Sequence, residues 1–393
     1  MGGGADRSAP VRAEESVSGG VDVWSDAVSS HAPDHLLVMV HGILGRYACS
    51  ILATGCSLGL EPFLFSHKAN PFVEKRGSEK NASMLTLDGV DVMGERLANE
   101  VLDVISRRPE ITKISFLAHS VGGLAARYAI ARLYRHPDSV SDGNTKGTIC
   151  GLEGINFITV ATPHLGSRGN KQVPLLFGSV AMEKVACHIV HWIFRRTGRH
   201  LFLTDDDEGL PPLLQRMVED HDDLYFISAL RAFRRRVVYA NADCDRILII
   251  SAVGNFLYGV HVVCFIVVVY FWLCTSLMDK PDIVGWRTSS IRRNNELPEL
   301  PVSSSDKYPH IVHEEHSEET DDDKWQDCMA ECDMDVLEEK MVTGLGKVSW
   351  EKVDVSFHSS MTSFAAHSII QVKYAFMNEG ADVIQHIIDH FQL

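Results

Sequence analysis

The sequence has less positive than negative charge, with 37 Lys and Arg against 52 Asp and Glu. Its formal net charge is −15 over 393 residues, which argues against nucleic acid as a partner, since phosphate binding needs clustered basic side chains. Much of the charge is local, because residues 311–340 hold 13 Asp and Glu against 2 Lys. Such a run is typical of a solvated segment, so we expect an acidic loop over residues 294–345.

The chain also lacks the residue patterns that bind metals and cofactors. Its nine Cys are odd in number and have no repeated spacing. Cys328 and Cys332 form a C-x3-C pair, but no His or Cys pair nearby completes a zinc set. No nucleotide or flavin motif is present in the sequence. We therefore predict no metal and no cofactor, and reduced thiols in an intracellular protein.

The N-terminus has no apolar core, so it is no secretory signal. Residues 1–33 are rich in Gly, Ser and Ala and are expected to be disordered. Gly2 is suggestive of acylation, but Asp6 stands where a myristoylation motif needs Ser or Thr. The protein is expected inside the cell, in the cytoplasm or associated with a membrane.

The chain does contain short apolar strands that alternate with helical patterns. The strands are β-branched runs without polar alternation, which is typical of a parallel sheet covered by helices on both faces. Strands are expected within residues 35–45, 113–118, 155–162, 235–241 and 350–357, and helices within 88–108, 121–135 and 381–391. We predict the α/β class, with residues 34–393 forming one domain that carries a helical cap at about 170–232.

Ser120 stands between an apolar run and a small-residue helical run, in the stretch "ISFLAHSVGGLAARYAI". A nucleophile elbow needs a strand end, a sharp turn and a helix, with small residues two positions away on either side of the serine. Ala118 and Gly122 hold those positions, so the pattern is A-x-S-x-G. We predict that Ser120 is a catalytic nucleophile, although a serine before two glycines is also common at ordinary helix starts.

A nucleophilic serine needs an oxyanion hole, a base and an acid that orients the base. The segment "VHGILG" predicts that the backbone N–H groups of Ile43 and Val121 form the oxyanion hole. In this architecture the acid and then the histidine follow the serine along the chain, each after a late strand.

Two acids and two histidines hold the expected positions. Asp243 and Asp245 follow the next-to-last strand, and the loop "FHSSMTSFAAHSII" offers His358 and His367 after the last one. The spacing of these residues does not choose between the two histidines.

Taken together, these motifs resemble a plant lipase-like family of serine esterases in the α/β-hydrolase superfamily. The matching segments are "VHGILG", "LTLDGVDVMGERLANEVLDVI", "SFLAHSVGGLAARYAI", "NFITVATPHLGSRG", "TGRHLFLTDDDEGLPPLLQRM", "VVYAN", "VGWRTSSIRR" and "KVDVSFHSSMTSFAAHSIIQVK". The resemblance implies hydrolysis of acyl esters, with a lipid as the expected substrate. It implies Ser120 as nucleophile, Asp245 as acid and His367 as base, with His358 as the alternative base. His164 in "ATPHLG" is expected to be structural.

Two stretches depart from the family pattern. Residues 46–80 match it poorly, and 38 residues separate Asp245 from Val284 where the family has one short loop. That gap contains residues 247–278, which hold no Asp, Glu, Lys or Arg and are a transmembrane candidate by hydropathy. A single span would place the two edges of one sheet on opposite sides of a membrane, so an apolar insertion packed on the protein or against a membrane is favoured. Asp282, just before "IVGW", is the alternative acid.

Two functional hypotheses follow from the sequence. The first is a serine hydrolase that cleaves carboxyl esters of acyl lipids through a Ser-His-Asp triad, without a cofactor. The second is a catalytically impaired hydrolase fold that acts as a membrane-associated binding or scaffold protein. The sequence does not indicate an oligomeric state.

Overall fold

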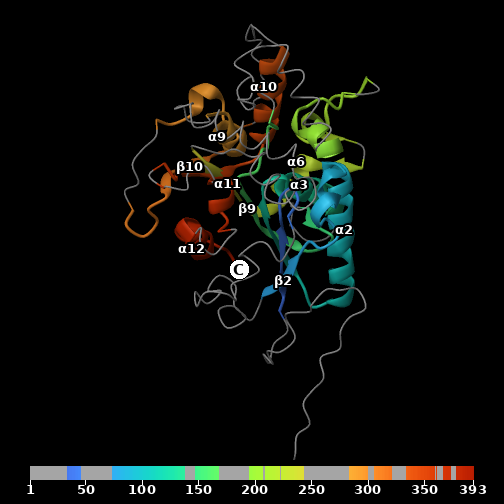
Figure 1. The fold of residues 1–393 in the computed structure, drawn as a ribbon. Helices are drawn as coiled ribbons and strands as arrows, with labels where there is room; N and C mark the ends of the chain where they lie inside the picture. The colour runs from blue at the N-terminus through green and yellow to red at the C-terminus, as the bar shows by residue number, and fades with distance from the viewer. Residues whose placement is uncertain are drawn as a thin grey trace, which may run out of the picture.

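The computed structural model has a central sheet with the strand order β10-β11-β9-β6-β3-β1-β2 (Figure 1). Its strands are β1 (His35–Val40), β2 (Val73–Gly77), β3 (Lys113–His119), β6 (Glu153–Val160), β9 (Phe233–Asn241), β10 (Ile311–Ser317) and β11 (Trp350–Val355). Neighbouring strands are parallel except for the antiparallel pair of β10 and β11. The predicted α/β class with a mostly parallel sheet is therefore confirmed.

The structure describes most of the domain predicted from the sequence. The described residues are 33–45, 73–137, 147–167, 194–206, 209–221, 223–242, 283–299, 305–320, 333–358, 360, 366–372 and 378–393. The predicted disorder of residues 1–33 falls almost entirely outside these ranges, as does the whole apolar segment 247–278. Both stay predictions.

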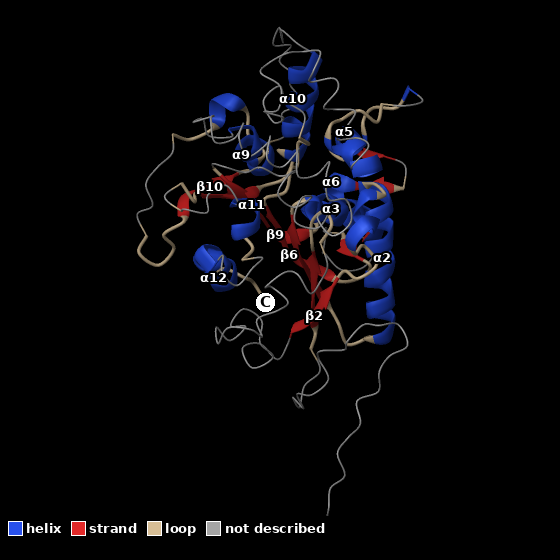
Figure 2. Ribbon diagram, in the orientation of Figure 1, coloured by secondary structure: helices blue, strands red, loops and turns tan. Residues whose placement is uncertain are grey.

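Helices cover both faces of the sheet (Figure 2). On one face, α2 (Val90–Arg107), α3 (Val121–Leu133) and α6 (Phe226–Arg231) bury their apolar side chains in one cluster with alternate residues of the strands. On the other face, α11 (Ala366–Ile369) and α12 (Ala381–Asp389) pack on the intervening strand residues. Covering on both faces explains why the strands read as continuous apolar runs.

The long helix α2 shows how the apolar spacing places a helix on the sheet. Its residues Val90, Met93, Leu97 and Val101 are buried, and their spacing of three to four puts them on one side of the helix. The helix ends at Arg107, two residues before Pro109. The structure thus confirms the helix predicted within residues 88–108.

Shorter elements lie between these strands and helices. They are η2 (Ser83–Leu87), β4 (Tyr134–Arg135), β5 (Thr148–Ile149), α5 (Leu213–Arg216), β7 (Asp220–His221), β8 (Leu224–Tyr225), α9 (Ile283–Ser290), η5 (Asn294–Glu296) and η7 (Asn378–Gly380). Within the predicted cap at about 170–232, α6 packs against α3 on the sheet. The cap as a whole stays a prediction, because much of it lies outside the described residues.

The segment predicted as an acidic loop over residues 294–345 differs from that prediction. It contains the edge strand β10 and the helix α10 (Asp333–Leu345). Both elements contain a few buried apolar side chains among their many charged ones. These are Ile311 in β10 and Met341, Val342 and Leu345 in α10. Burial of such side chains outweighs the preference of their charged neighbours for solvent.

The poorly matching stretch 46–80 also contains regular structure. Its last part forms β2, which pairs in parallel with β1 at the edge of the sheet. Residues 46–72 lie outside the described residues.

Candidate active site

Ser120 occupies the turn between β3 and α3 in a backbone conformation that serine rarely adopts. Its φ is 55° and its ψ is −136°, in the left-handed half of conformational space that costs energy for residues other than glycine. The turn is held on both sides, because the Ser120 N–H donates to Val160 O at 2.9 Å and Ser120 O accepts from Thr162 Oγ1 at 2.9 Å. This is the geometry of a nucleophile on a strand-to-helix turn, and Ser120 is buried there.

The small residues around the serine are needed because three backbone segments meet there. A Cβ added to Gly122 would lie 2.5 Å from His41 O and 2.8 Å from Val40 O. A Cβ added to Gly42 would lie 2.7 Å from the Ser120 Cβ. All three contacts are closer than a Cβ tolerates, so the glycines let the "HGILG" loop approach the serine.

His367 is the histidine that the fold brings to the serine. Its Nε2 lies 2.9 Å from Ser120 Oγ, although 247 positions separate the two residues. His367 is in α11 and is buried. His358 lies exposed after β11, where its backbone N–H donates to Ser356 Oγ at 3.3 Å.

A second histidine contacts the first. His119 Nε2 lies 2.9 Å from the backbone oxygen of His367, and the two rings lie 4.7 Å apart between centroids. Since a carbonyl oxygen only accepts, His119 must carry its hydrogen on Nε2. The residue before the serine therefore ties the elbow to the backbone that carries His367, a contact that sequence reasoning missed.

The two N–H groups predicted for the oxyanion hole belong to Ile43 in the loop after β1 and to Val121 at the start of α3. Val121 is the first residue of α3, so its N–H has no acceptor within the helix. The oxygen of the Gly42–Ile43 peptide accepts from the Gly45 N–H at 3.1 Å. Because a trans peptide directs its N–H opposite to its oxygen, this bond turns the Ile43 N–H away from Gly45.

The acid candidates Asp243, Asp245 and Asp282 lie outside the described residues. The strand that precedes the first two, β9, ends at Asn241, which is fully buried. Among the residues that the structure describes, neither polar atom of the Asn241 side chain has a hydrogen-bond partner. A buried amide in this state marks a place where a further polar group is needed.

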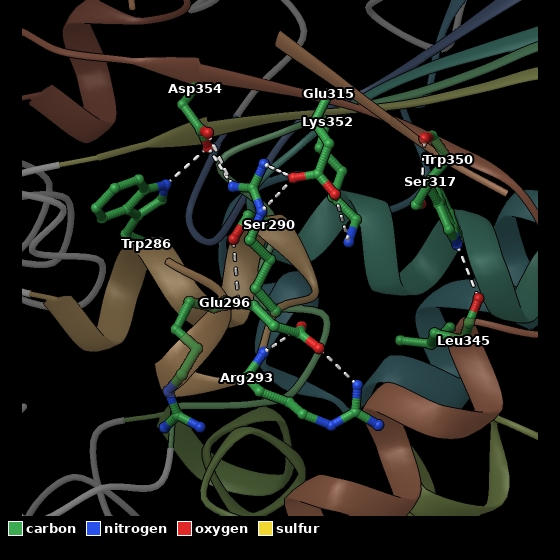
Figure 3. A network of polar contacts seen from close by, with 12 residues as sticks. Trp286, Ser290, Arg293, Glu296, Glu315, Ser317, Leu345, Trp350, Lys352 and Asp354 are labelled. Carbon is green, nitrogen blue, oxygen red and sulfur yellow. Dashed lines mark hydrogen bonds and ion pairs between the residues drawn. The ribbon is translucent and has the colours of Figure 1, made fainter. Parts of the chain in front are cut away.

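Beyond the apolar segment, the "VGWRTSSIRR" motif returns to the sheet through a buried ion pair (Figure 3). Arg292 Nη1 lies 2.8 Å from each carboxylate oxygen of Asp354, and Trp286 Nε1 donates to the same carboxylate at 2.7 Å. Arg292 also binds Glu315 at the sheet edge through Nη2 at 2.8 Å. The motif thus anchors α9 to β11 and β10.

Asp354 is a second feature that sequence reasoning missed. The signal was present, because Asp354 lies between Val353 and Val355 in a strand and must point to the opposite face from them. Those two valines pack on the face that carries α11. Asp354 therefore points away from the face of His367, and its carboxylate is already engaged by Arg292.

The "ATPHLG" segment contacts α3, the helix that follows Ser120. His164 is buried with its Nε2 2.9 Å from Thr159 Oγ1, and burial lowers its pKa well below the ordinary value. Arg127 of α3 donates to Met217 O at 2.8 Å and to His164 O at 3.4 Å. Burial lowers the pKa of Arg127 to about 9. These contacts agree with the structural role expected for His164.

In the part of the chain that the structure describes, no three His, Cys, Asp or Glu side chains are grouped as a metal site would need. None of the helices in the same ranges has both the length and the apolarity to cross a membrane.

A serine in a strained strand-to-helix turn, hydrogen-bonded to a histidine that follows the last strand of a parallel sheet, defines a nucleophile elbow of the α/β-hydrolase fold. Comparison with known proteins agrees with this class. The chain belongs to the family described as "Putative serine esterase (DUF676)", whose model matches residues 30–255.

Two curated relatives and a solved structure show how far the similarity extends. The chain is similar to "Putative lipase ROG1" of Saccharomyces cerevisiae, with 31% identity over 234 residues, which is 58% of this chain and 30% of that protein. It is also similar to "Putative lipase YDR444W" of the same yeast, with 26% identity over 55% of this chain and 31% of that protein. The chain thus spans about a third of the length of these relatives. Since they are yeast proteins, the narrower resemblance to plant members stays a prediction.

A lipase from Bacillus licheniformis, BlEst2 in its propeptide form, is among the similar solved structures. It has 15% identity and a TM-score of 0.32, over 53% of this chain and 36% of that chain. The assignment of the α/β-hydrolase fold given above depends on the chain's own sheet and Ser120 turn, and not on the likeness to BlEst2.

Proposed function

We propose that the protein hydrolyses carboxyl esters, with Ser120 as nucleophile and His367 as general base. The observation that carries this proposal is the 2.9 Å contact between Ser120 Oγ and His367 Nε2 at a strained turn. For Nε2 to accept the serine hydrogen, His367 must carry its own hydrogen on Nδ1. A carboxylate beside Nδ1 stabilises that tautomer, and Asp245 is the proposed acid, with Asp243 and Asp282 as alternatives.

The reaction follows from the positions of these groups. His367 Nε2 takes the Ser120 proton while Oγ attacks the ester carbonyl, and the resulting imidazolium returns the proton to the departing alcohol. Water then attacks the acyl-serine with the same histidine as base, the bond from the acyl carbon to Oγ breaks, and the histidine returns the proton to Ser120 Oγ as the carboxylic acid leaves. The N–H groups of Ile43 and Val121 would stabilise the tetrahedral oxyanion in both halves of the reaction, each contributing about 3 to 4 kcal/mol.

Acyl-lipid esters are the proposed substrates. The support is that both curated relatives carry the name lipase, in addition to the family motifs in the sequence. A membrane surface as the place of substrate binding is proposed on the same ground, with no cofactor or metal in the reaction.

The proposal is tested by labelling the purified protein with a fluorophosphonate and by measuring hydrolysis of nitrophenyl esters of short and long acyl chains. Ser120→Ala should abolish both, and His367→Ala should reduce both by at least about a thousandfold. His358→Ala, a change of the exposed histidine in the same loop, is the matched control and should leave both rates unchanged. Well-folded wild-type protein that neither labels nor hydrolyses would contradict the proposal and leave the scaffold hypothesis in its place.

The acid is identified by the same assay. Asp243→Asn, Asp245→Asn and Asp282→Asn change the three candidates one at a time, and the asparagine keeps the size of the side chain. The variant that lacks the true acid should lose about ten-thousandfold in kcat, because the amide favours the wrong tautomer of the histidine. If Asp245→Asn leaves activity intact, the assignment of Asp245 as the acid is wrong.

A further inference from the structure

The motif "LTLDGVD" has no part in the reaction described so far, yet it lies beside the loop that carries Ile43. Thr86 of this motif is buried and accepts a hydrogen bond from the Leu44 backbone N–H at 2.8 Å through its Oγ1. The same hydroxyl donates to Ser83 O at 2.7 Å. Since the hydroxyl has one hydrogen, the bond to Ser83 leaves a lone pair directed at Leu44.

The neighbouring backbone holds the same loop at a second point. The Ser83 N–H donates to Gly45 O at 2.8 Å, and the Gly45 N–H donates to Gly42 O at 3.1 Å. The Gly42 oxygen shares a peptide plane with the Ile43 N–H, so the direction of that N–H depends on where Gly45 and Leu44 are held. Leu44 has a φ of 53°, which is a strained conformation for leucine and needs such support.

Thr86 is in turn held by a segment far away in the chain. Thr197 Oγ1 donates to Thr86 O at 2.7 Å and accepts from the Gly89 N–H at 3.0 Å. His200 Nδ1 accepts from the Val90 N–H at 3.0 Å. Thr197 therefore both positions Thr86 and binds the residue before α2, while His200 caps the first N–H of that helix.

We propose that Thr86 is a positioning residue for the oxyanion hole, acting through the Leu44 N–H on the direction of the Ile43 N–H. This inference rests on the proposed esterase function. Loss of the hydroxyl would leave Leu44 without this bond, so the Gly42–Ile43 peptide would no longer be held with its N–H towards the reacting oxygen. The effect should concern the transition state, because the oxyanion exists there and not in the bound ester.

Two variants separate the hydroxyl from the shape of the side chain. Thr86→Val keeps the shape and removes the hydroxyl, whereas Thr86→Ser keeps the hydroxyl. Thr86→Val should lower kcat about 10- to 100-fold at nearly unchanged KM, and Thr86→Ser should keep kcat within about threefold of wild type. Thr112→Val makes the same change at an exposed threonine before β3 and should leave kcat unchanged.

A boronic acid that forms a tetrahedral adduct with the serine reports on the oxyanion hole without turnover. Its affinity for Thr86→Val should fall by the same factor as kcat, and that for Thr86→Ser should not. All rates are divided by the fraction of protein that unfolds cooperatively on heating, so a folding defect is not counted as a loss of catalysis. Equal kcat and boronate affinity in the valine and serine variants would overturn the role of Thr86 while the esterase function stands. A wild-type protein that neither hydrolyses esters nor binds the boronate would overturn both.

Discussion

Polar residues are arranged differently in the amino half of the strands and at their carboxyl ends. In the amino half, neutral side chains of neighbouring strands bond one another: Ser115 Oγ lies 2.8 Å from His35 Nε2 and accepts two N–H groups of Asn156 at 3.0 Å. Asn156 in turn exchanges hydrogen bonds with the backbone of Gln392 near the C-terminal end. These bonds join β1, β3, β6 and the residues after α12.

At the carboxyl ends of the same strands, the polar groups are arranged around strained backbone. Ser120 and Leu44 both have positive φ, and the Val121 N–H lies at the start of α3, where it has no acceptor within the helix. The amino half thus contributes to stability through hydrogen bonds between neighbouring strands, whereas the carboxyl ends hold strained backbone around Ser120.

The largest expected effect concerns the carboxyl ends of the strands and tests the buried ion pair of Arg292 and Asp354. Arg292→Met should lower the free energy of unfolding by about 3 to 5 kcal/mol, because Asp354 would be left as an uncompensated buried charge. Urea unfolding measures this change. Lys80→Met, which breaks an exposed pair with Asp103, is the control and should change the free energy of unfolding far less.

Removing both members of the pair sharpens the same test. Arg292→Met combined with Asp354→Leu should recover part of the loss, since no charge then remains buried. A single Arg292→Met change that costs no more than the Lys80→Met control would show that the pair does not anchor the motif.

A smaller effect concerns the neutral hydrogen bonds of the amino half. Burial, and then the positive charge of Lys113, lower the pKa of His35 to about 4. Ser115 Oγ accepts two N–H groups, so its own hydrogen points at His35 Nε2. Protonation would put a hydrogen on His35 Nε2 as well, and two donors would then face each other. Between the ordinary pKa of His and pH 4 the unfolded chain binds the extra proton, so stability should fall as pH falls, by about 3 kcal/mol in total.

The variant His35→Gln isolates this contribution. The glutamine oxygen can accept from Ser115 and does not titrate, so urea unfolding at several values between pH 7 and pH 4 should show a flatter pH dependence than in wild type. Identical slopes for both proteins would mean that His35 is not the titrating group.

The smallest expected effect tests the link between the elbow and its histidine. His119→Leu removes the hydrogen bond to the His367 oxygen and should lower kcat about tenfold at nearly unchanged KM, because the base is then less well held against Ser120. His119→Gln retains an amide donor and should recover most of the activity. Steady-state kinetics on one nitrophenyl ester measure both; a leucine variant with wild-type kcat would remove His119 from the site.

Much of the fold could be predicted because its signals are local. Apolar runs identified the inner strands of the sheet, and a spacing of three to four identified α2. β10 and α10 were missed because their few buried residues are diluted by acidic ones, and charge dominates any local average. Among the site residues, Ser120 was predictable because the small residues around it are required by sterics within a few positions of the chain.

The choice between His358 and His367 was not predictable in the same way. Both histidines follow β11 in one short stretch of sequence, so spacing treats them alike. Only the packing of α11 against the sheet brings His367 to Ser120 and leaves His358 exposed. The roles of Thr86 and Asp354 were hidden for a related reason, since a hydroxyl or carboxylate says nothing about its partner until the chain is folded.

Local pattern therefore accounts for the α/β class, the elbow and its serine, because strand and helix periodicity and steric crowding act between near neighbours. Which histidine meets the serine and which residues hold the "HGILG" loop depend on contacts between segments up to 248 positions apart. Such contacts arise when burial of the two apolar clusters brings the carboxyl ends of the strands together. Their geometry is a property of that packing rather than of any one stretch of sequence.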